Sequence, residues 1–478
     1  MNLPKALLTF SAALALACAA AAQATLTDMG GNAPRPYAMS PDGVWFTGID
    51  FNGGFRWSAG TLFQPIAMSS NGFPDIALGG SPVSASMTNL GGNEEAGQWT
   101  PGGVTFLGGL GGQSGTSISS VYAASDNGGA VVGLGWVNAG KAHAFRWTQA
   151  TGMVDLGAQL ATRSSRANGV SGDGSLVVGW DEDATGFRRA AYWPGGVPTW
   201  LSANPSEAWD ANTDGSVVVG VDAGQLFRWT QATGLVQLGK LPGSAPDDDC
   251  TGLSVSADGN TIVGFNGDLF FGTPYRAFIW RPGAGIVVLK DLLVALGAAN
   301  AASVNLSIAH DVSADGRTIA AQTGLPPFGP FKGWIARLPE VAVNYCTAKT
   351  NSQGCAPTMA FSGTPSASSG SGFELATSQV IPGVSGLLFY GTTGAAALPF
   401  QGGFLCVAGK VTRTPAQLSG GSGTCGGTFS MDFNAYVAAS GDPALIGGAT
   451  VWCQYWSRDV FSPSGTNLTD GLTFTLWP

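Results

Sequence analysis

The chain has 478 residues, of which 11% are charged, and its formal net charge is −9. An acidic chain without basic clusters argues against nucleic acid or an anionic membrane surface as the partner. The 73 glycines and 15 tryptophans are typical of a protein with many short strands, in which glycine forms the turns and tryptophan fills the spaces between sheets.

The N-terminal segment, residues 1–24, has the features of a secretory signal peptide. Lys5 precedes an apolar run, and the AQA sequence at residues 22–24 matches the small-residue pattern of a cleavage site. We therefore expect a secreted protein whose mature chain begins at Thr25. Cys18 offers a lipoprotein signal as the alternative, although it lacks the usual leucine three residues before it. No later run is long and apolar enough to predict a transmembrane segment.

From Thr25 to about residue 340 a short sequence motif is repeated seven times. Its fullest copy, residues 123–157, reads as four short apolar runs separated by breaks rich in Asn, Asp and Gly. A unit of about 45 residues with four strands is the size of one β-propeller blade.

Two features mark each copy, namely a turn after the first strand and a tryptophan in the third strand. The turns are Asp42-Gly43, Asn71-Gly72, Asn127-Gly128, Asp173-Gly174, Asp214-Gly215, Asp258-Gly259 and Asp315-Gly316. The tryptophans are Trp57, Trp99, Trp147, Trp193, Trp229, Trp280 and Trp334. In such a turn Asp accepts backbone hydrogen bonds and Gly allows positive φ, so the pair needs no functional explanation.

The two ends of the repeat array complement each other. The last copy stops after its third strand, GWIARL at residues 333–338, whereas LTDMG at residues 26–30 matches the fourth strand of the fullest copy, MVDLG at 153–157. A ring that takes its missing strand from its other end has no open edge. The sequence therefore predicts a closed seven-bladed β-propeller over residues 25–340, with a short helix at residues 290–299.

Several of these phrases resemble a known family. SADG followed by IVG (residues 256–264), HAFRWT (143–148) and GMVDLG (152–157) look like the HAF-type extracellular repeats of secreted bacterial proteins. The stretch from Leu289 to Leu338 resembles the last repeat of that family. The resemblance implies an extracellular β-propeller-like fold, and it supplies no catalytic residues.

The order of strands in a blade predicts which connections share a face. The 1–2 and 3–4 connections are tight turns, whereas the 2–3 and 4–1 connections at the other end are long and dissimilar: residues 134–141, 180–189, 239–250 and 265–276. Variable loops on a rigid scaffold are where recognition usually occurs. Exposed aromatic rings beside Asp and Arg would stack on and hydrogen-bond to sugars, so the ligand-binding candidates are Trp136, Trp180, Asp181, Asp183, Arg188 and Trp209. As an alternative, the tryptophans fill gaps between blades.

Signals for catalysis or metal binding are weak. His143 and His310 have no Ser or Cys partner in a nucleophile motif. The alternative to a binding protein is a propeller glycoside hydrolase or polysaccharide lyase, in which two carboxylates converge within about 5–10 Å; the candidates are Asp181, Asp183, Asp222 and Asp268. No cofactor is expected, apart from Ca²⁺ as an option for the acidic loops at residues 180–186 and 247–249.

Residues 344–478 differ in composition and predict a β-sandwich-like or jelly-roll domain. NYCTAK, PFQGGFLCVAG and WCQYWSRD resemble a C-terminal module of secreted proteins from environmental bacteria, whose function is unknown. In an exported chain its five cysteines favour disulfides. Cys346 is close enough to Cys355 to close a small loop, and Cys406 has two possible partners, Cys425 and Cys453. The remaining cysteine either stays free or bonds to Cys250. The sequence alone leaves these pairings open, since disulfide connectivity cannot be deduced from spacing.

Taken together, the sequence predicts a secreted, non-catalytic binding or adhesion protein. Its loop-rich propeller face is expected to recognise an extracellular or cell-surface glycan or protein, and its C-terminal module to serve attachment or assembly.

Overall fold

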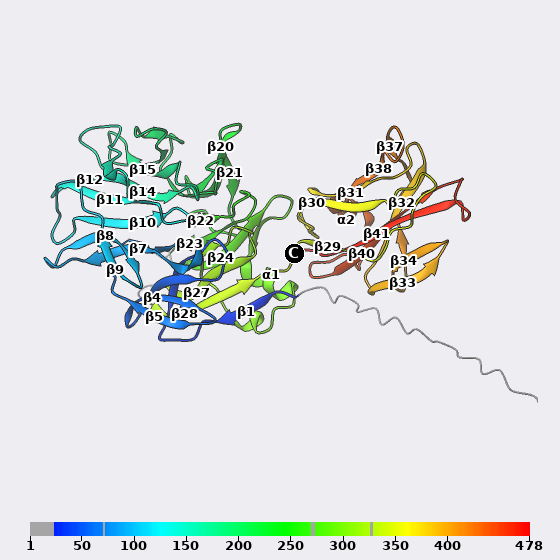
Figure 1. Cartoon of the computed structure of the whole chain (residues 1–478), viewed down its shortest axis with the longest axis horizontal. Helices are drawn as coiled ribbons and strands as arrows, with labels where there is room; N and C mark the ends of the chain where they lie inside the picture. Colours follow the sequence, from blue (N-terminus) through cyan, green and yellow to red (C-terminus); the bar gives the residue numbers. More distant parts are fainter. Residues whose placement is uncertain (1–22, 70–71, 269–272, 326–327) are drawn as a thin grey trace, which may run out of the picture.

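A computed structural model of the chain describes residues 23–69, 72–268, 273–325 and 328–478. The predicted signal peptide falls almost entirely outside these residues. The protein is built of β-strands in two lobes, which we call the N-terminal lobe (residues 23–338) and the C-terminal lobe (residues 339–478) (Figure 1). In the parts that the structure describes, no helix is long and apolar enough to cross a membrane.

The described residues of the N-terminal lobe form seven four-stranded antiparallel sheets. Sheets 1 to 3 are β2–β5 (Arg35–Met39, Phe46–Asp50, Gly53–Ser58, Leu62–Ile66), β6–β9 (Asp75–Ile76, Val83–Thr88, Glu94–Thr100, Gly103–Phe106) and β10–β13 (Ser119–Ala124, Ala130–Asn138, Lys141–Thr148, Gly152–Asp155). Sheets 4 and 5 are β14–β17 (Ser165–Val170, Val177–Glu182, Arg188–Tyr192, Thr199–Trp200) and β18–β21 (Ser206–Ala211, Val217–Asp222, Gln225–Thr230, Gly234–Gly239). Sheet 6 is β22–β25 (Asp249–Val255, Ile262–Asp268, Thr273–Arg281, Gly285–Val288).

Sheet 7 combines the two ends of the lobe. It contains β26–β28 (Ile308–Val312, Thr318–Leu325, Phe328–Arg337), and its fourth strand is β1 (Thr25–Asp28). β1 runs antiparallel to β28, with Thr25 opposite Arg337 and Asp28 opposite Trp334. Sheet 7 also lies against sheet 1, because the amide of Ala314 donates to the carbonyl of Pro41 at 2.8 Å.

The Asp-Gly and Asn-Gly turns join the first and second strands in sheets 1 and 3 to 7. In sheet 1 the Asp42 carboxylate accepts the amide of Val44 at 3.1 Å, and Gly43 has φ of 67°. Sheet 2 differs from the prediction: Asn71 lies outside the described residues and Gly72 precedes β6, so the turn is made by the 3-10 turn Leu78–Gly80 instead. Its Gly79 and Gly80 supply the positive φ that Asp-Gly supplies elsewhere.

The tryptophan of the third strand holds the same register position in six sheets. In sheet 3, Trp147 is opposite Val131, but in sheet 7 the corresponding position belongs to Ala336. Trp334 lies two residues earlier, at the position that Phe145 occupies in sheet 3. Because strand side chains alternate with a period of two, this shift keeps the ring on the same face of the sheet.

Neighbouring sheets pack through apolar side chains and are linked by a recurring hydrogen bond. In the described part of the lobe, six third strands carry an Arg or Gln that donates to a glycine carbonyl in the first turn of the next sheet. The pairs are Arg56–Gly80 (2.7 Å), Gln98–Gly128 (2.7 Å), Arg146–Gly174 (2.8 Å), Arg228–Gly259 (3.1 Å), Arg281–Gly316 (2.7 Å) and Arg337–Gly43 (3.1 Å). The last pair joins sheet 7 to sheet 1.

The predicted helix is present as α1 (Leu289–Ala295), shorter at its C-terminus than expected. Leu289, Leu292 and Leu293 are fully buried in a cluster that includes Leu26 of β1 and Trp477 of the C-terminal lobe. The helix therefore packs where the two chain ends of the N-terminal lobe and the second lobe meet.

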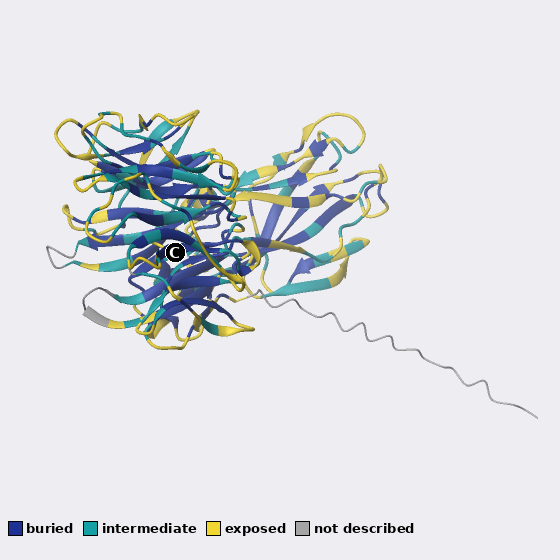
Figure 2. Ribbon diagram, turned by 60° about the vertical axis from the view of Figure 1, so that its left-hand side comes forward, coloured by how far each residue is buried: buried dark blue, intermediate teal, exposed yellow. Residues whose placement is uncertain are grey.

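The C-terminal lobe contains a six-stranded and a three-stranded sheet with an apolar layer between them. The first contains β29 (Ala342–Tyr345), β41 (Thr466–Thr475), β40 (Thr450–Arg458), β32 (Ser385–Gly391), β35 (Thr412–Arg413) and β36 (Gln417–Leu418); the second contains β30 (Thr358–Gly363), β31 (Phe373–Ser378) and β39 (Ser430–Asp432). The hairpins β33–β34 (Ala395–Phe400, Gly403–Val407) and β37–β38 (Gly420–Gly421, Gly427–Thr428) and helix α2 (Phe433–Ser440) complete the lobe. Phe373 and Leu375 of one sheet share a buried cluster with Leu388 and Leu472 of the other, and Figure 2 shows the buried strands of both lobes.

The described residues contain two disulfides, and their pairing differs from the pairings considered from sequence spacing. The bonds are Cys346–Cys406 and Cys355–Cys425. Cys346 and Cys355 are near in sequence but belong to different bonds. Cys346 bonds to Cys406 in β34 of the β33–β34 hairpin, and Cys355 bonds to Cys425 in the loop between β37 and β38. Cys453 and Cys250 are free and buried: Cys453 lies in the core of the C-terminal lobe and Cys250 in the core between sheets 5 and 6.

The two lobes are in direct contact. The Nδ2 group of Asn434 donates to the carbonyl of Gly283 at 3.3 Å. The Arg281 guanidinium lies over the Trp477 ring at 5.0 Å from its centre, and Arg281 also makes the link between sheets 6 and 7.

Candidate binding cavity

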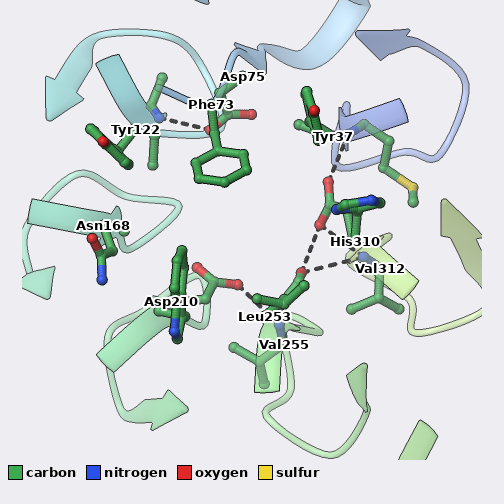
Figure 3. A pocket seen from close by; sticks show the side chains of 18 of the residues that line it. Tyr37, Phe73, Asp75, Tyr122, Asn168, Asp210, Leu253, Val255, His310 and Val312 are labelled. Atoms are coloured by element: carbon green, nitrogen blue, oxygen red, sulfur yellow. Dashed lines mark hydrogen bonds between the residues drawn. The ribbon is translucent and has the colours of Figure 1, made fainter. Parts of the chain in front are cut away.

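A cavity of about 520 Å³ lies among the first strands of the seven sheets. Residues from every one of these strands, or from the segment directly before it, line the cavity. Figure 3 shows their side chains converging from different sheets. The cavity is therefore formed by all seven sheets together rather than by one loop.

In six of the seven sheets, a β-bulge in the first strand directs one side chain into this space. In six sheets of the described lobe the strand register shifts by one residue, and the extra residue leaves the ladder. The bulged residues are Tyr37, Tyr122, Asn168, Trp209, Leu253 and His310, and sheet 2 contributes Phe73, which precedes β6.

The aromatic members of this set are in contact. The ring centre of Phe73 is 5.3 Å from Tyr37, 5.8 Å from Tyr122 and 6.1 Å from Trp209, in edge-on geometries. Tyr37 is in turn 5.2 Å from the His310 ring. Phe73 is 37% exposed although it lies among these rings, so its ring faces open cavity space.

Three aspartates in the first strands β6, β18 and β26 form hydrogen bonds to the next sheet. Asp75 accepts the amide of Ala124 in sheet 3 at 2.7 Å, Asp210 accepts that of Val255 in sheet 6 at 2.9 Å, and Asp311 accepts that of Met39 in sheet 1 at 2.6 Å. Asp311 also accepts the Ser254 hydroxyl at 2.6 Å. These bonds are drawn as dashed lines in Figure 3.

The position of these carboxyls deep in the lobe raises their pKa values. Burial is the main cause and mutual repulsion adds to it: the pKa of Asp75 rises to about 7, that of Asp311 to about 6, and that of Asp210 well above its usual range. Burial has the opposite effect on His310 and lowers its pKa to about 4, so the ring is neutral near pH 7. His310 Nε2 lies 2.9 Å from Gln322 Oε1.

The two ends of the cavity are made differently. At the Asp-Gly turns, main-chain hydrogen bonds connect successive sheets, for example from the Asp126 amide to the Gly172 carbonyl (3.0 Å) and from the Ala257 amide to the Ala314 carbonyl (3.0 Å). At the other end the second and third strands contribute side chains: Phe265 and Tyr275 stack at 4.4 Å, and the Arg35 guanidinium lies over Phe331 at 4.9 Å. Aromatic rings therefore gather on the side of the 2–3 connections.

Of the six residues predicted to bind ligand, Trp209 lines the cavity. Trp180 does not, because it lies in β15 instead of a loop and is only 4% exposed. It packs against the guanidinium groups of Arg166 (5.3 Å) and Arg188 (4.6 Å), and Arg188 is also paired with Glu207.

Trp136, Asp181 and Asp183 also have structural partners away from the cavity lining. Trp136 lies in β11, where its Nε1 donates to the Ser117 hydroxyl at 3.3 Å. Asp181 is fully buried and accepts the indole N–H of Trp200 at 2.7 Å. Asp183 accepts bonds from Thr185 and Arg189, and the Thr185 hydroxyl is the main cause of its lowered pKa.

Two of the predicted long 2–3 loops are in part paired strand. β11 and β12 remain paired as far as Asn138 and Lys141, and β15 and β16 as far as Glu182 and Arg188. In the third, at residues 265–276, residues 269–272 lie outside the described residues. The prediction of open recognition loops at residues 134–141 and 180–189 was therefore wrong in part, because the strands continue into these segments.

The carboxylates considered for catalysis belong to three different sheets. Asp181 is on β15 and Asp183 directly follows that strand, whereas Asp222 is on β19 and Asp268 on β23. Asp222 accepts the Ser202 hydroxyl at 2.5 Å and the amide of Gln237 at 2.6 Å. Across the described ranges, including both acidic loops considered for calcium, no group of three or more His, Cys, Asp or Glu side chains is placed to hold a metal ion.

Sequence reasoning overlooked most of the cavity, including Tyr37, Phe73, Tyr122 and the three aspartates. A signal was present. The bulged residue varies in size and chemistry between copies, whereas a small residue stands on at least one side of it in every copy, as in Ala167-Asn168-Gly169 and Ala208-Trp209-Asp210.

The fold and this site define a class: an all-β, propeller-like protein with a ligand-sized central cavity. No protein-family model matches the chain, and no curated protein matches it. Solved structures to which the chain is similar include a putative TolB from Agrobacterium tumefaciens (13% identity, 66% of this chain and 98% of that chain, TM-score 0.35). Others are TolB from Acinetobacter baumannii (13%, 53% and 63%, 0.34) and oligogalacturonate lyase from Vibrio parahaemolyticus (14%, 66% and 94%, 0.43).

Proposed function

We propose that the protein is an exported binding protein whose N-terminal lobe is a closed seven-bladed β-propeller, and that a carbohydrate binds in its central cavity. The observation that carries this proposal is the ring of bulged side chains, which the seven sheets direct into one space.

Closure of the ring is supported by three contacts between sheets 7 and 1. The Asp311 carboxylate accepts a hydrogen bond from the amide of Met39. Arg337 donates to the carbonyl of Gly43, and the amide of Ala314 donates to the carbonyl of Pro41. The same types of contact join consecutive sheets elsewhere in the lobe. β1 completes the sheet that would otherwise end in an open edge.

The chemistry of the lining supports a sugar as ligand. Ligand pockets span about 300–1,000 Å³ and combine aromatic walls with a few convergent polar groups. Tyr37, Phe73, Tyr122 and Trp209 offer ring faces to the C–H faces of a pyranose, and Asn168 offers an amide. Two disulfides are typical of an oxidising compartment, which agrees with the signal peptide predicted at residues 1–24. The C-terminal lobe then serves attachment or assembly.

Calorimetry of the mature chain, residues 25–478, against a panel of oligosaccharides tests the proposal. Trp209→Ala and Phe73→Ala should each weaken binding at least tenfold, because each removes a ring from the cavity wall. Trp136→Ala is the matched control, since it removes a half-buried tryptophan elsewhere in the lobe. Binding that survives both cavity substitutions but is lost in the control would contradict a central site.

An enzyme acting on extracellular polymers is the second candidate. Asp75, whose pKa is about 7, lines an aromatic cavity, and such a carboxyl suits general acid catalysis. Both of its oxygens also accept backbone amides, which accounts for its presence without catalysis. Release of reducing ends in the same titrations, abolished in Asp75→Asn, would establish the enzyme; no release supports the binding protein.

A further inference from the structure

We propose that the ligand of the central cavity is cationic, namely a sugar that carries a protonated or quaternary amino group. This inference rests on the proposed function and specifies its ligand class.

The titratable side chains that line the cavity are mostly acidic. Among the described lining residues, Asp75, Asp126, Asp210 and Asp311 are acidic, and Arg35 supplies the cationic side chain. Arg35 lies against the Phe331 ring rather than against a carboxylate. Burial raises the pKa values of the Asp75, Asp210 and Asp311 carboxyls, so they retain protons toward neutral pH, and it lowers the pKa of His310, which is neutral near pH 7. A ligand with a positive group would therefore take the place of protons that these carboxyls hold.

The aromatic walls favour the same group. A cation is attracted to the face of an aromatic ring within about 6 Å of its centre. The edge-on packing of Phe73 against Tyr37, Tyr122 and Trp209 turns these rings at large angles to one another. The Arg166 guanidinium already lies over the Tyr122 ring at 4.4 Å and over the Trp209 ring at 5.8 Å, so these two rings interact with a cation in the protein itself. An amino sugar would place its ring C–H groups and its ammonium group against the same walls.

The carboxylates retain acceptor capacity. Asp75 accepts the amides of Ile76 and Ala124, and Asp210 those of Ala211 and Val255. A carboxylate offers about four acceptor positions, so two remain on each. An ammonium group bonded there would also relieve the repulsion that these carboxylates exert on one another.

Binding should consequently be linked to protons. The charges of Asp126 and Asp311 raise the pKa of Asp75, and those of Asp75 and Asp311 raise that of Asp210. Arg35 and His310 line the same cavity, and Arg166 lies over the rings of Tyr122 and Trp209. The pKa values of Asp75 and Asp311, about 7 and 6, mean that these groups lose protons as the pH rises from 5 to 7.5. The affinity for a permanently charged ligand should rise severalfold over this range, with release of protons on binding.

The experiment compares two disaccharides of the same skeleton with the mature chain. One is glucosamine-β1,4-glucosamine with trimethylated amino groups, whose charge is independent of pH, and the other is its neutral N-acetylated form. Choline is the sugar-free probe. We expect the trimethylated disaccharide to bind at least tenfold more tightly than the acetylated one, with affinity rising from pH 5 to pH 7.5. Trp209→Ala and Asp210→Asn should remove this preference, and Trp136→Ala should retain it.

The outcomes separate the two proposals. Equal or tighter binding of the acetylated disaccharide would overturn the cationic ligand and leave the carbohydrate site standing, as would an affinity that does not change with pH. Choline binding as tightly as the trimethylated disaccharide, without binding of the acetylated form, would support the charge and overturn the carbohydrate. Failure of all three probes would overturn both. Circular dichroism of each variant shows whether a lost affinity reflects unfolding.

Discussion

The residues of each repeat fall into positions that recur and positions that vary. The Asp-Gly turn and the third-strand tryptophan recur, and they form turns and the packing between sheets. The bulge position holds Tyr37, Asn168, Trp209 or His310 in different sheets, and it faces the cavity. The recurring residues therefore determine the fold, whereas the varying residues at one internal position determine the site.

The link made by Arg281 should contribute measurably to stability. Its guanidinium is buried and donates to the Thr261 hydroxyl and the Gly316 carbonyl. Arg281→Met would leave a buried carbonyl without this donor, which costs about 2–3 kcal/mol of unfolding free energy. Denaturant unfolding measures the loss, and Arg413→Met, at an exposed site of the C-terminal lobe, should change stability by less than about 0.5 kcal/mol. Equal effects would refute the structural role of the link.

The Asp75 carboxyl should make stability depend on pH. Its pKa is about 7 in the folded protein, against 3.8 as the ordinary value. Between these values folding takes up a proton, so the contribution of Asp75 to stability declines as the pH rises from 5 to 7.5. The stability advantage of the wild type over Asp75→Asn should shrink across this range in thermal unfolding. Asp214→Asn, at an exposed turn where the pKa is lowered, should show no such trend.

At the scale of elements, strand-turn-strand signals predicted the sheets well and their ends poorly. The apolar runs and the Asp-Gly breaks locate most strands of the N-terminal lobe, because both signals are local. The hairpins that extend through Trp136 and Trp180 were missed, since pairing between polar strand ends leaves no alternating pattern to detect. The bulges were missed for a related reason: they depend on the partner strand, which the sequence of one strand does not contain.

The disulfides are expected to stabilise the C-terminal lobe. Cys355 and Cys425 are 70 residues apart, and closing a loop of this size stabilises the folded state by about 4 kcal/mol in the chain-entropy model. A Cys355→Ala/Cys425→Ala variant should lose stability of this order in denaturant unfolding.

Peptide mapping without reduction should find the Cys346–Cys406 and Cys355–Cys425 pairs. Cys250 should resist alkylation until the protein unfolds, because it is buried and burial raises its thiol pKa to about 12. A Cys346–Cys355 peptide would contradict the structure.

At the scale of the whole molecule, the sequence predicted an all-β protein with a repeat region followed by a second unit of different composition. It predicted a loop-rich binding face and not the cavity, because a cavity lined by the first strands of seven sheets belongs to no single repeat. Trp209 was identified from its aromatic character alone, whereas Asp75 and Asp311 became visible once the neighbouring sheets were in place. The C-terminal pairing of cysteines likewise required the folded chain.

β1 should be needed for the integrity of the N-terminal lobe. Leu26 of β1 is opposite Ala336 and packs into the cluster around α1. Leu26→Lys would place a charge in that cluster, lower the unfolding free energy by about 2–4 kcal/mol and expose the edge of β28 to self-association. Val154→Lys, on the fourth strand of sheet 3, is the control because its side chain is 43% exposed. Calorimetry and light scattering that showed no difference between the two variants would contradict a closing role for β1.

The pairing of Thr25 with Arg337 also has a consequence for the order of events during biosynthesis. β1 leaves the ribosome before every other strand of this lobe, yet its partner β28 is translated some three hundred residues later. The last sheet therefore cannot be completed while the chain is still short, and contacts of such long range form slowly. β1 therefore stays without its partner until nearly the whole lobe has been synthesised, and pairing of β1 with β28 is expected to be the last step in the folding of this lobe.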